Sequence, residues 1–565
     1  MHHRSRGFRL GLIATCVYAI AVATRLAPLH WSPLPATLDG FVHANNAAQT
    51  LAEGQVPSAG QRADQLTSPV ILGMASAVTN VEPLYLAQPL YGLVGAATAL
   101  VAVGFALRLA RTRGWYPGRT TSVALLAGFA VAIEGLFVRR TGVPDDEAFT
   151  LLLIPLAALA LVQYLRGCHR GWLAALLPML FILPLTHTLS SLIAALTLTA
   201  VVSAELVRRL TRKTALPAVG IATAFWVFMT GYYELATLSG LTVPYVGRVS
   251  GYPGLFVAWT ITLVLGVVWY QRTSRWVQRA IVLVPLGLFF AVMLTNRVVS
   301  VFPGTPRTPL VVLILILPLA VPVAVAGWAA PLLGKRDAVG VVLLALLAAP
   351  VSHVLFGLTA ALSPAFFATV LRTQTFGHIP VLVVAAAGAV GVLGGSAGVL
   401  SREGADTSAG PTVASDGGWP RGRAVVILLV VVALVGTAPV AYVNLDTGSY
   451  PTGATETEYA AAGFVAAYAD GEVATDHKQG RIVEFRGGSA GMAPLVSWLD
   501  GGPPPETALV SKGYWTTTGA HLFPGAPRTV SENRFECTLA ERHRVYHTDG
   551  IHAISVTLPA TGKSM

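Results

Sequence analysis

The sequence predicts a polytopic α-helical membrane protein that ends in a small α/β domain. Of its 565 residues, 54% are hydrophobic and only 12% are charged, whereas a typical soluble protein carries about 25% charged residues. Apolar runs long enough to cross a bilayer recur along residues 1–443. Residues 444–565 are more polar and contain many Gly and Pro residues between short alternating runs, which is typical of a small folded domain.

Thirteen apolar runs of roughly 20 residues are candidate membrane-spanning helices. They cover residues 8–27, 84–107, 120–138, 148–165, 171–186, 188–207, 216–237, 253–271, 279–296, 309–331, 338–358, 378–400 and 424–443. With thirteen spans and a cytoplasmic N-terminus, the basic clusters between the spans all fall on the cytoplasmic side, as the positive-inside rule requires. The exception is the pair Arg139 and Arg140, which falls outside. We therefore expect a multi-pass protein of the cell membrane with an extracytoplasmic C-terminal domain.

The loops and the tail complete the expected organisation of the chain. We expect a multi-span domain over residues 1–443 with a long first outer loop at 28–83, a flexible cytoplasmic loop at 401–422 and an extracytoplasmic soluble domain at 444–565. Helical spacing predicts helices at Leu38–Ala52, 69–80 and Thr455–Tyr468, and alternation predicts strands at Gly480–Phe485 and His552–Leu558.

Charge and cysteine content exclude two further classes of protein. The net charge is +11, but the basic residues are dispersed among membrane loops, and 444–565 holds 13 acidic and 9 basic residues. A nucleic-acid-binding protein gathers its basic residues on one face, so we expect no nucleic-acid partner. Cys16, Cys168 and Cys537 lie in unrelated segments and predict no disulfide framework.

Acidic residues gather where outward loops meet the membrane. Asp39 begins the helical pattern of the first outer loop, and Asp145, Asp146 and Glu147 directly precede the fourth span. Helix capping explains any one of these acids. Three acids in a row beside Arg139 and Arg140 exceed what a cap requires. Carboxylates of two loops can hold a divalent cation or accept a proton from an attacking group.

This combination resembles the GT-C membrane glycosyltransferases, in which an acidic residue of the first outer loop is followed by a D-x-E-type motif before the fourth span. The resemblance covers the topology of the whole chain, and its motifs are Asp39 and Asp145–Glu147. It is similar to the oligosaccharyltransferase catalytic subunits and to archaeal dolichyl-phosphate-mannose mannosyltransferases. Oligosaccharyltransferases carry a WWDYG-type motif, for which this chain has only Lys512-Gly513-Tyr514-Trp515. In contrast, the segment from Ala474 to Phe485 is similar to the opening of the outer domain in monosaccharide transferases.

The resemblance implies a transferase that moves a sugar, with mannose as the favoured candidate, from a polyprenyl-phosphate or dolichyl-phosphate donor to an N-linked or lipid-linked glycan. Asp39, Asp145 and Glu147 would be the catalytic residues and would hold Mg²⁺ or Mn²⁺. The other candidates are substrate-binding residues, namely Arg139, Arg140, His43, His187, Arg297, Arg307 and Arg372. Arg248 is a further outward arginine, which we rank below Arg297 and Arg307 because these two flank the loop that gates the donor in the resembled family.

Two other functions stay open from the sequence. One is en bloc transfer of an oligosaccharide to protein, and the other is a transporter or flippase of lipid-linked glycans. A transporter typically shows inverted repeats and ionisable residues near the bilayer midplane. Here the two halves show no repeat and the charges gather at the outer edge, which favours the transferase.

Overall fold

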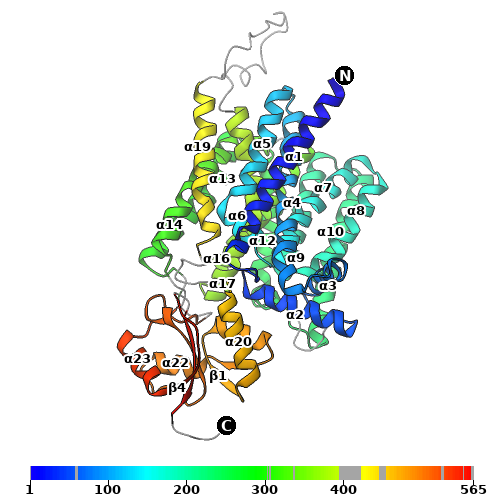
Figure 1. Cartoon of the computed structure of the whole chain (residues 1–565). Helices are drawn as coiled ribbons and strands as arrows, with labels where there is room; N and C mark the ends of the chain where they lie inside the picture. Colours follow the sequence, from blue (N-terminus) through cyan, green and yellow to red (C-terminus); the bar gives the residue numbers. More distant parts are fainter. Residues whose placement is uncertain are drawn as a thin grey trace, which may run out of the picture.

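The computed structural model describes residues 2–56, 62–301, 303, 307–334, 337–392, 421–443, 453–522, 527–550 and 553–560. These residues form a tall helical bundle with a small sheet domain at one end (Figure 1). The N-terminus lies at the opposite end of the bundle from the sheet domain (Figure 1). Most of the predicted loop at 401–422 and the start of the predicted domain at 444–452 lie outside the described residues.

The bundle confirms a multi-pass membrane protein. Its helices are α1 (His2–Leu26), α4 (Pro83–Thr112), α5 (Pro117–Ile133), α6 (Gly135–Thr141), α7 (Glu147–Gly167), α8 (Arg170–Thr186), α9 (Thr188–Arg208), α10 (Arg212–Leu238), α12 (Pro253–Tyr270), α13 (Arg275–Val298), α14 (Leu310–Ile316), α15 (Ala320–Ala329), α16 (Ala338–Ala360), α17 (Pro364–Thr373), α18 (His378–Ala387) and α19 (Arg421–Thr437). Among the described residues, 11 helices are long and apolar enough to cross a membrane, or up to 12 if α5 and α6 form one bent span. Helix α8 accounts for the thirteenth predicted run, but it is shorter than the others.

One predicted loop is instead part of a span. The predicted spans at 338–358 and 378–400 leave residues 359–377 as an outward loop, whereas α17 and α18 join into one span over Pro364–Gly391. Ser363 begins α17 by accepting a hydrogen bond from the backbone N–H of Phe366. Arg372, which contacts Glu147, and Gln374 interrupt the apolar pattern, and this hid the helix from the sequence prediction.

A sharp bend in the third span brings an acidic loop to the edge of the bundle. Helices α5 and α6 meet at 64°. At the break, Glu134 accepts hydrogen bonds from two backbone N–H groups of α6, and the buried Arg25 donates to two carbonyls at the end of α5. Backbone groups within a membrane must be paired inside the protein, so these two side chains make the break tolerable. His378 contacts Glu134 at 2.6 Å, which supplies the partner that this buried acid requires.

The first outer loop contains two helices, α2 (Leu38–Glu53) and α3 (Thr67–Thr79). Both confirm predicted elements. Figure 1 places them at the end of the bundle next to the sheet domain. The buried ring of Phe41 in α2 packs against Phe485, at 5.3 Å between ring centroids, and against Tyr459. Helix α2 therefore connects the bundle to the C-terminal domain.

The C-terminal domain has three layers. Its elements are α20 (Glu456–Tyr468), β1 (Glu472–Ala474), α21 (His477–Phe485), β2 (Ser489–Gly491), α22 (Ala493–Leu499), β3 (Leu509–Lys512), α23 (Glu532–Ala540), β4 (Arg542–His547) and β5 (Ile554–Pro559). The strand order is β2-β1-β3-β5-β4, with β2, β1 and β3 parallel and β5 antiparallel to both β3 and β4. One sheet face packs on α20, α21 and α2, and the other packs on α22 and α23.

The predictions for this domain are partly confirmed. Helix α20 and strand β5 lie where the sequence places them, and Thr455 and Glu458 form a capping box that fixes the start of α20. The expected strand at Gly480–Phe485 is wrong, because this segment belongs to α21. Its buried Ile482 and Val483 point to one side of a short helix that starts at the Asp476 cap. Six residues are too few to separate the two periodicities.

Candidate functional site

Two helix starts bring acidic and imidazole side chains together at the edge of the bundle. Helix α7 starts at Glu147, and the Asp145 carboxylate accepts a hydrogen bond from the backbone N–H of Glu147 at 3.1 Å. Helix α9 starts after His187, which separates it from α8 by one residue. Helix N-termini stabilise negative charge, so both helices direct positive potential toward the acids.

Asp145, Glu147 and His187 form a compact group of potential ligands. One donor atom of each lies within 4.8 Å of the others, and all three side chains are buried. Among the described residues, Glu147 Oε2 and His187 Nε2 have no hydrogen-bond partner. Buried polar atoms without a partner are rare in folded proteins and point to a missing ligand. Two carboxylates and one imidazole suit a divalent transition-metal ion such as Mn²⁺ better than Mg²⁺, which prefers oxygen ligands only.

The His187 ring can expose its Nε2 atom to such an ion. Its Nδ1 accepts a hydrogen bond from the backbone N–H of Ser190 at 3.3 Å and lies 2.8 Å from Ser190 Oγ. Cation binding would use the other tautomer, in which Nδ1 carries the proton and donates to Ser190 Oγ, because the lone pair of Nε2 is then free. Burial lowers the pKa of His187 to about 4, so the ring is neutral at pH 7.

One arginine of a distant helix completes this cluster. Arg372 of α17 lies 3.4 Å from Glu147 Oε1 and 4.0 Å from Asp145 Oδ2. Burial alone would raise the pKa of Asp145, but the Arg372 guanidinium holds it well below its usual range. Asp145 is therefore ionised, and the site combines an anionic ligand group with a partly exposed cation.

Asp146 points away from this group toward α2 and α3. It accepts a hydrogen bond from Ser68 and lies 3.7 Å from His43 Nε2. Burial raises the pKa of Asp146 to about 7. His43, which the sequence analysis names as a substrate-binding candidate, lies one helical turn after Asp39 in α2, and the structure pairs it with Asp146.

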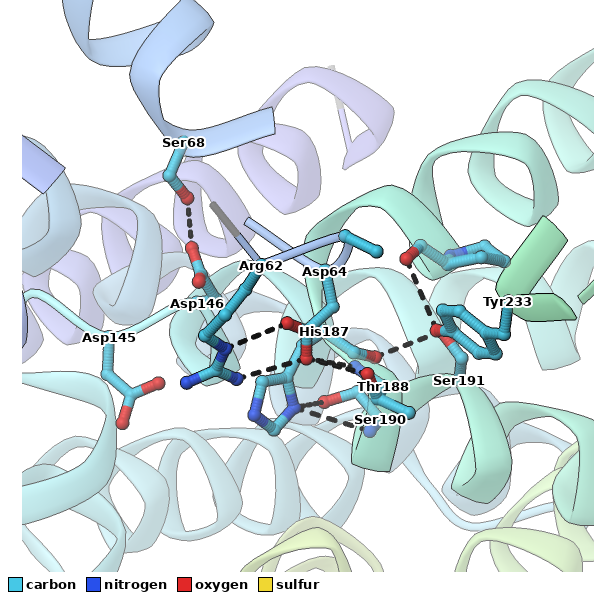
Figure 2. A network of polar contacts seen from close by, with 12 residues as sticks. Arg62, Asp64, Ser68, Asp145, Asp146, His187, Thr188, Ser190, Ser191 and Tyr233 are labelled. Carbon is cyan, nitrogen blue, oxygen red and sulfur yellow. Dashed lines mark hydrogen bonds and ion pairs between the residues drawn. The ribbon is translucent and has the colours of Figure 1, made fainter. Parts of the chain in front are cut away.

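Figure 2 shows a second set of contacts that the sequence did not predict. Arg62 forms an ion pair with Asp64 at 3.0 Å, and Asp64 Oδ2 accepts hydrogen bonds from the backbone N–H and the hydroxyl of Thr188. Asp64 thereby holds the start of α9, and with it the neighbouring His187. The only sequence signal for this role is a pair of charged residues just before the short apolar helix at 69–80.

Asp39 lies near the cluster but outside the ligand group. It is half-buried in the first turn of α2. Its charge acts on Glu147 and Arg372 on one side and on His477 of the C-terminal domain on the other. The expected ligand set of Asp39, Asp145 and Glu147 therefore differs from the observed group, in which His187 takes the place of Asp39.

The other predicted residues divide into two groups. Arg140 acts on both Asp145 and Glu147 through its charge, and Arg139 lies beside it. Arg297, at the end of α13, and Arg307 are exposed and make no ion pair with these acids among the described residues. Exposed, flexible arginines at the end of a span are expected to reach for water or lipid headgroups.

The fold and this cluster define a multi-span membrane protein with a buried polar site where its helix bundle meets a C-terminal α/β domain. No family model and no curated protein matches the sequence. One similar solved structure is the oligosaccharyltransferase of Archaeoglobus fulgidus in a complex with Zn and sulfate. Its TM-score is 0.48 at 11% identity, over 97% of this chain and 74% of that chain.

A second similar structure is ArnT from Cupriavidus metallidurans bound to undecaprenyl phosphate. Its TM-score is 0.38 at 14% identity, over 98% of both chains. With TM-scores under 0.5, neither similarity identifies the function of this chain, which has to be inferred from its own residues.

Proposed function

We propose that the protein is a GT-C-type membrane glycosyltransferase, which moves a sugar such as mannose from a polyprenyl-phosphate donor to a glycan acceptor outside the cytoplasm. The observation that carries this proposal is the convergence of Asp145, Glu147, His187 and Arg372 in one buried cluster with two unpartnered ligand atoms. This cluster can receive both a cation and the phosphate of a lipid donor.

An apolar groove supports a lipid-linked donor. The groove has a cavity volume of about 130 Å³ and lies among α13, α16, α17 and α18. Its polar lining side chains, Gln374 and His378, lie two and six positions after Arg372 in the chain. Helix α17 thus presents Phe367 and Leu371 to the groove and Arg372 to the acids. An isoprenoid chain in the groove would have its phosphate close to the guanidinium.

The proposed reaction assigns one role to each of these groups. An acceptor hydroxyl attacks the anomeric carbon of the donor sugar, and its proton passes to the Asp39 carboxylate. The bond between the anomeric carbon and the phosphate oxygen breaks, and Arg372 receives the leaving lipid phosphate. A divalent cation bound by Asp145, Glu147 and His187 would supply further positive charge toward that phosphate. The C-terminal domain lies next to Asp39 and would bind the acceptor.

Sugar transfer by the purified full chain in lipid nanodiscs tests this proposal. The assay uses radiolabelled polyprenyl-phosphate mannose and an oligosaccharide acceptor. We expect Asp39→Asn and Glu147→Gln to lower the transfer rate at least about 100-fold, because each removes a charge that acts in the transition state. Glu53→Gln is the matched control, since Glu53 is an exposed acid at the far end of α2.

The outcomes of this assay separate the candidate functions. Near-normal transfer by both variants would contradict the proposed site. Transfer only from a diphosphate-linked oligosaccharide to a peptide would favour en bloc transfer. Movement of the lipid across the bilayer without sugar transfer would favour a flippase.

A further inference from the structure

A second arginine, Arg248, lies close to Arg372 and is held there by two groups. Arg248 belongs to α11 (Val246–Ser250), in the segment between α10 and α12. Its guanidinium lies over the Tyr245 ring, 4.4 Å from the centroid, and donates a hydrogen bond to the hydroxyl of Thr369. Thr369 precedes Arg372 by three residues on α17, so both arginines lie along the same side of that helix.

The charges of these two arginines are unequally balanced. Arg372 is paired with Glu147 and Asp145, whereas Arg248 forms no ion pair with a carboxylate in the part of the chain that the structure describes. Burial lowers the pKa of Arg248, and the positive charge of Arg372 lowers it further. Two half-buried like charges are unfavourable together unless an anion joins them. Arg248 is therefore the arginine of this pair whose charge no carboxylate contacts among the described residues, and this charge can receive an incoming anion.

The backbone that carries Arg248 is strained. Tyr245 has φ +66°, one of three non-glycine residues with positive φ among the described residues. A bulky residue rarely adopts this left-handed conformation, and such outliers often mark functional sites. The Tyr245 ring lies 5.8 Å from the His187 ring, between His187 and Arg248. The strained turn thus connects the ligand group to the second arginine.

We propose that Arg248 and Arg372 together bind one phosphate group, with Tyr245 and Thr369 fixing the position of Arg248. The phosphate is either the headgroup of a polyprenyl phosphate or free phosphate. This inference rests on the proposed function for its role in the reaction, where Arg248 is a second binding residue for the donor phosphate. Arginine suits this role because its planar group both stacks on an aromatic ring and forms paired hydrogen bonds with phosphate oxygens.

Equilibrium binding to the full chain in nanodiscs tests this inference without sugar transfer. The probes are polyprenyl phosphate, neutral polyprenol and inorganic phosphate. We expect Arg248→Gln to weaken binding of polyprenyl phosphate about tenfold and to leave binding of polyprenol unchanged. Arg248→Lys should recover only part of the affinity, because lysine keeps the charge but loses the planar stacking group. Arg272→Gln is the matched control, since Arg272 is an exposed arginine just after α12 that the proposed site does not include.

Two further measurements complete the test. In the transfer assay, Arg248→Gln should raise KM for the donor more than it lowers kcat, because the lost contact is present before the reaction begins. Tyr245→Gly relieves the strain but frees Arg248, and should weaken phosphate binding in the same direction. Tight binding of inorganic phosphate that depends equally on Arg248 would identify free phosphate as the ligand.

The possible failures can be distinguished. Binding within twofold of the wild-type value in a folded Arg248→Gln protein would overturn the inference, whether or not sugar is transferred. Binding that depends on Arg248 in a protein that transfers no sugar would overturn the proposed function and leave this site in place.

Discussion

The protein buries charges in two places that differ in one respect. In the C-terminal domain, Glu458 and Asp476 face Lys478 and Lys512, and each carboxylate oxygen accepts at least one hydrogen bond. In the bundle, Asp145, Glu147 and His187 include two atoms without a partner. Both clusters are buried, so burial does not distinguish them.

The two clusters differ in how completely their charged groups are hydrogen-bonded, and this difference indicates different roles. The network of the C-terminal domain has equal numbers of acids and lysines and joins α20, α21 and β3, which is typical of a structural network. The cluster of the bundle leaves Glu147 Oε2 and His187 Nε2 without a hydrogen-bond partner among the described residues. A buried charged cluster is therefore a candidate site when some of its polar atoms are unpaired, rather than merely because it is charged.

The largest expected effect is a loss of stability when the buried charge network of the C-terminal domain loses one lysine. Lys512→Met keeps the shape of the side chain but leaves Glu458 and Asp476 with one lysine between them. We expect the free energy of unfolding of the C-terminal domain to fall by about 3–5 kcal/mol, because a buried charge loses its partner. Thermal unfolding of the full chain in detergent measures this change.

Arg528→Met is the control for that variant. Arg528 pairs with Asp500 at the surface, and exposed ion pairs contribute about 0–1 kcal/mol. Equal thermal shifts for the two variants would show that the buried network adds nothing beyond a surface pair.

A smaller expected effect is the stabilisation of the protein by a metal ion bound at the cluster of the bundle. Mn²⁺ should raise the unfolding temperature of the wild-type protein. At 100 times its Kd, the ion would add about 2.7 kcal/mol to the free energy of unfolding. Glu147→Gln should abolish this shift, because it removes one of the three ligands. Glu484→Gln, at an exposed acid of α21, should retain it. An equal shift in all three proteins would place the ion elsewhere.

The smallest effect is an opposite response of the two regions to pH. Lys478 and Lys512 overcome the effect of burial and lower the pKa of Glu458 to about 2 from 4.5. Its contribution to stability is therefore complete above pH 4.5 and is lost as the pH falls toward 2. Burial raises the pKa of Asp146 to about 7 from 3.8. Its contribution is complete below pH 3.8 and is lost as the pH rises through 7.

Unfolding temperatures at a series of pH values measure both trends. From pH 5 to pH 7, wild-type protein should lose stability relative to Asp146→Asn, by up to about 1.4 kcal/mol per pH unit. From pH 4 to pH 2, it should lose stability relative to Glu458→Gln. Parallel curves for wild type and Asp146→Asn would mean that Asp146 is ionised in the folded protein across this range.

The sequence alone determined the membrane architecture, the polar C-terminal domain and the acidic motif at Asp145–Glu147. These features are local, since an apolar run of about 20 residues or a group of adjacent acids is visible without knowing the fold. Helices α2 and α20 were predictable for the same reason.

Only the tertiary structure decided which distant residues join the motif. Arg372 reaches Glu147 across 225 positions of sequence, and Asp64 reaches Thr188 across 124. Arg248, Arg297 and Arg307 look alike as outward arginines in the sequence, and only the family resemblance ranked Arg297 and Arg307 above Arg248. The packing of α17 and α11 against the starts of α7 and α9 separates them, since the strength of a contact between charges depends on distance and burial, which no local pattern encodes.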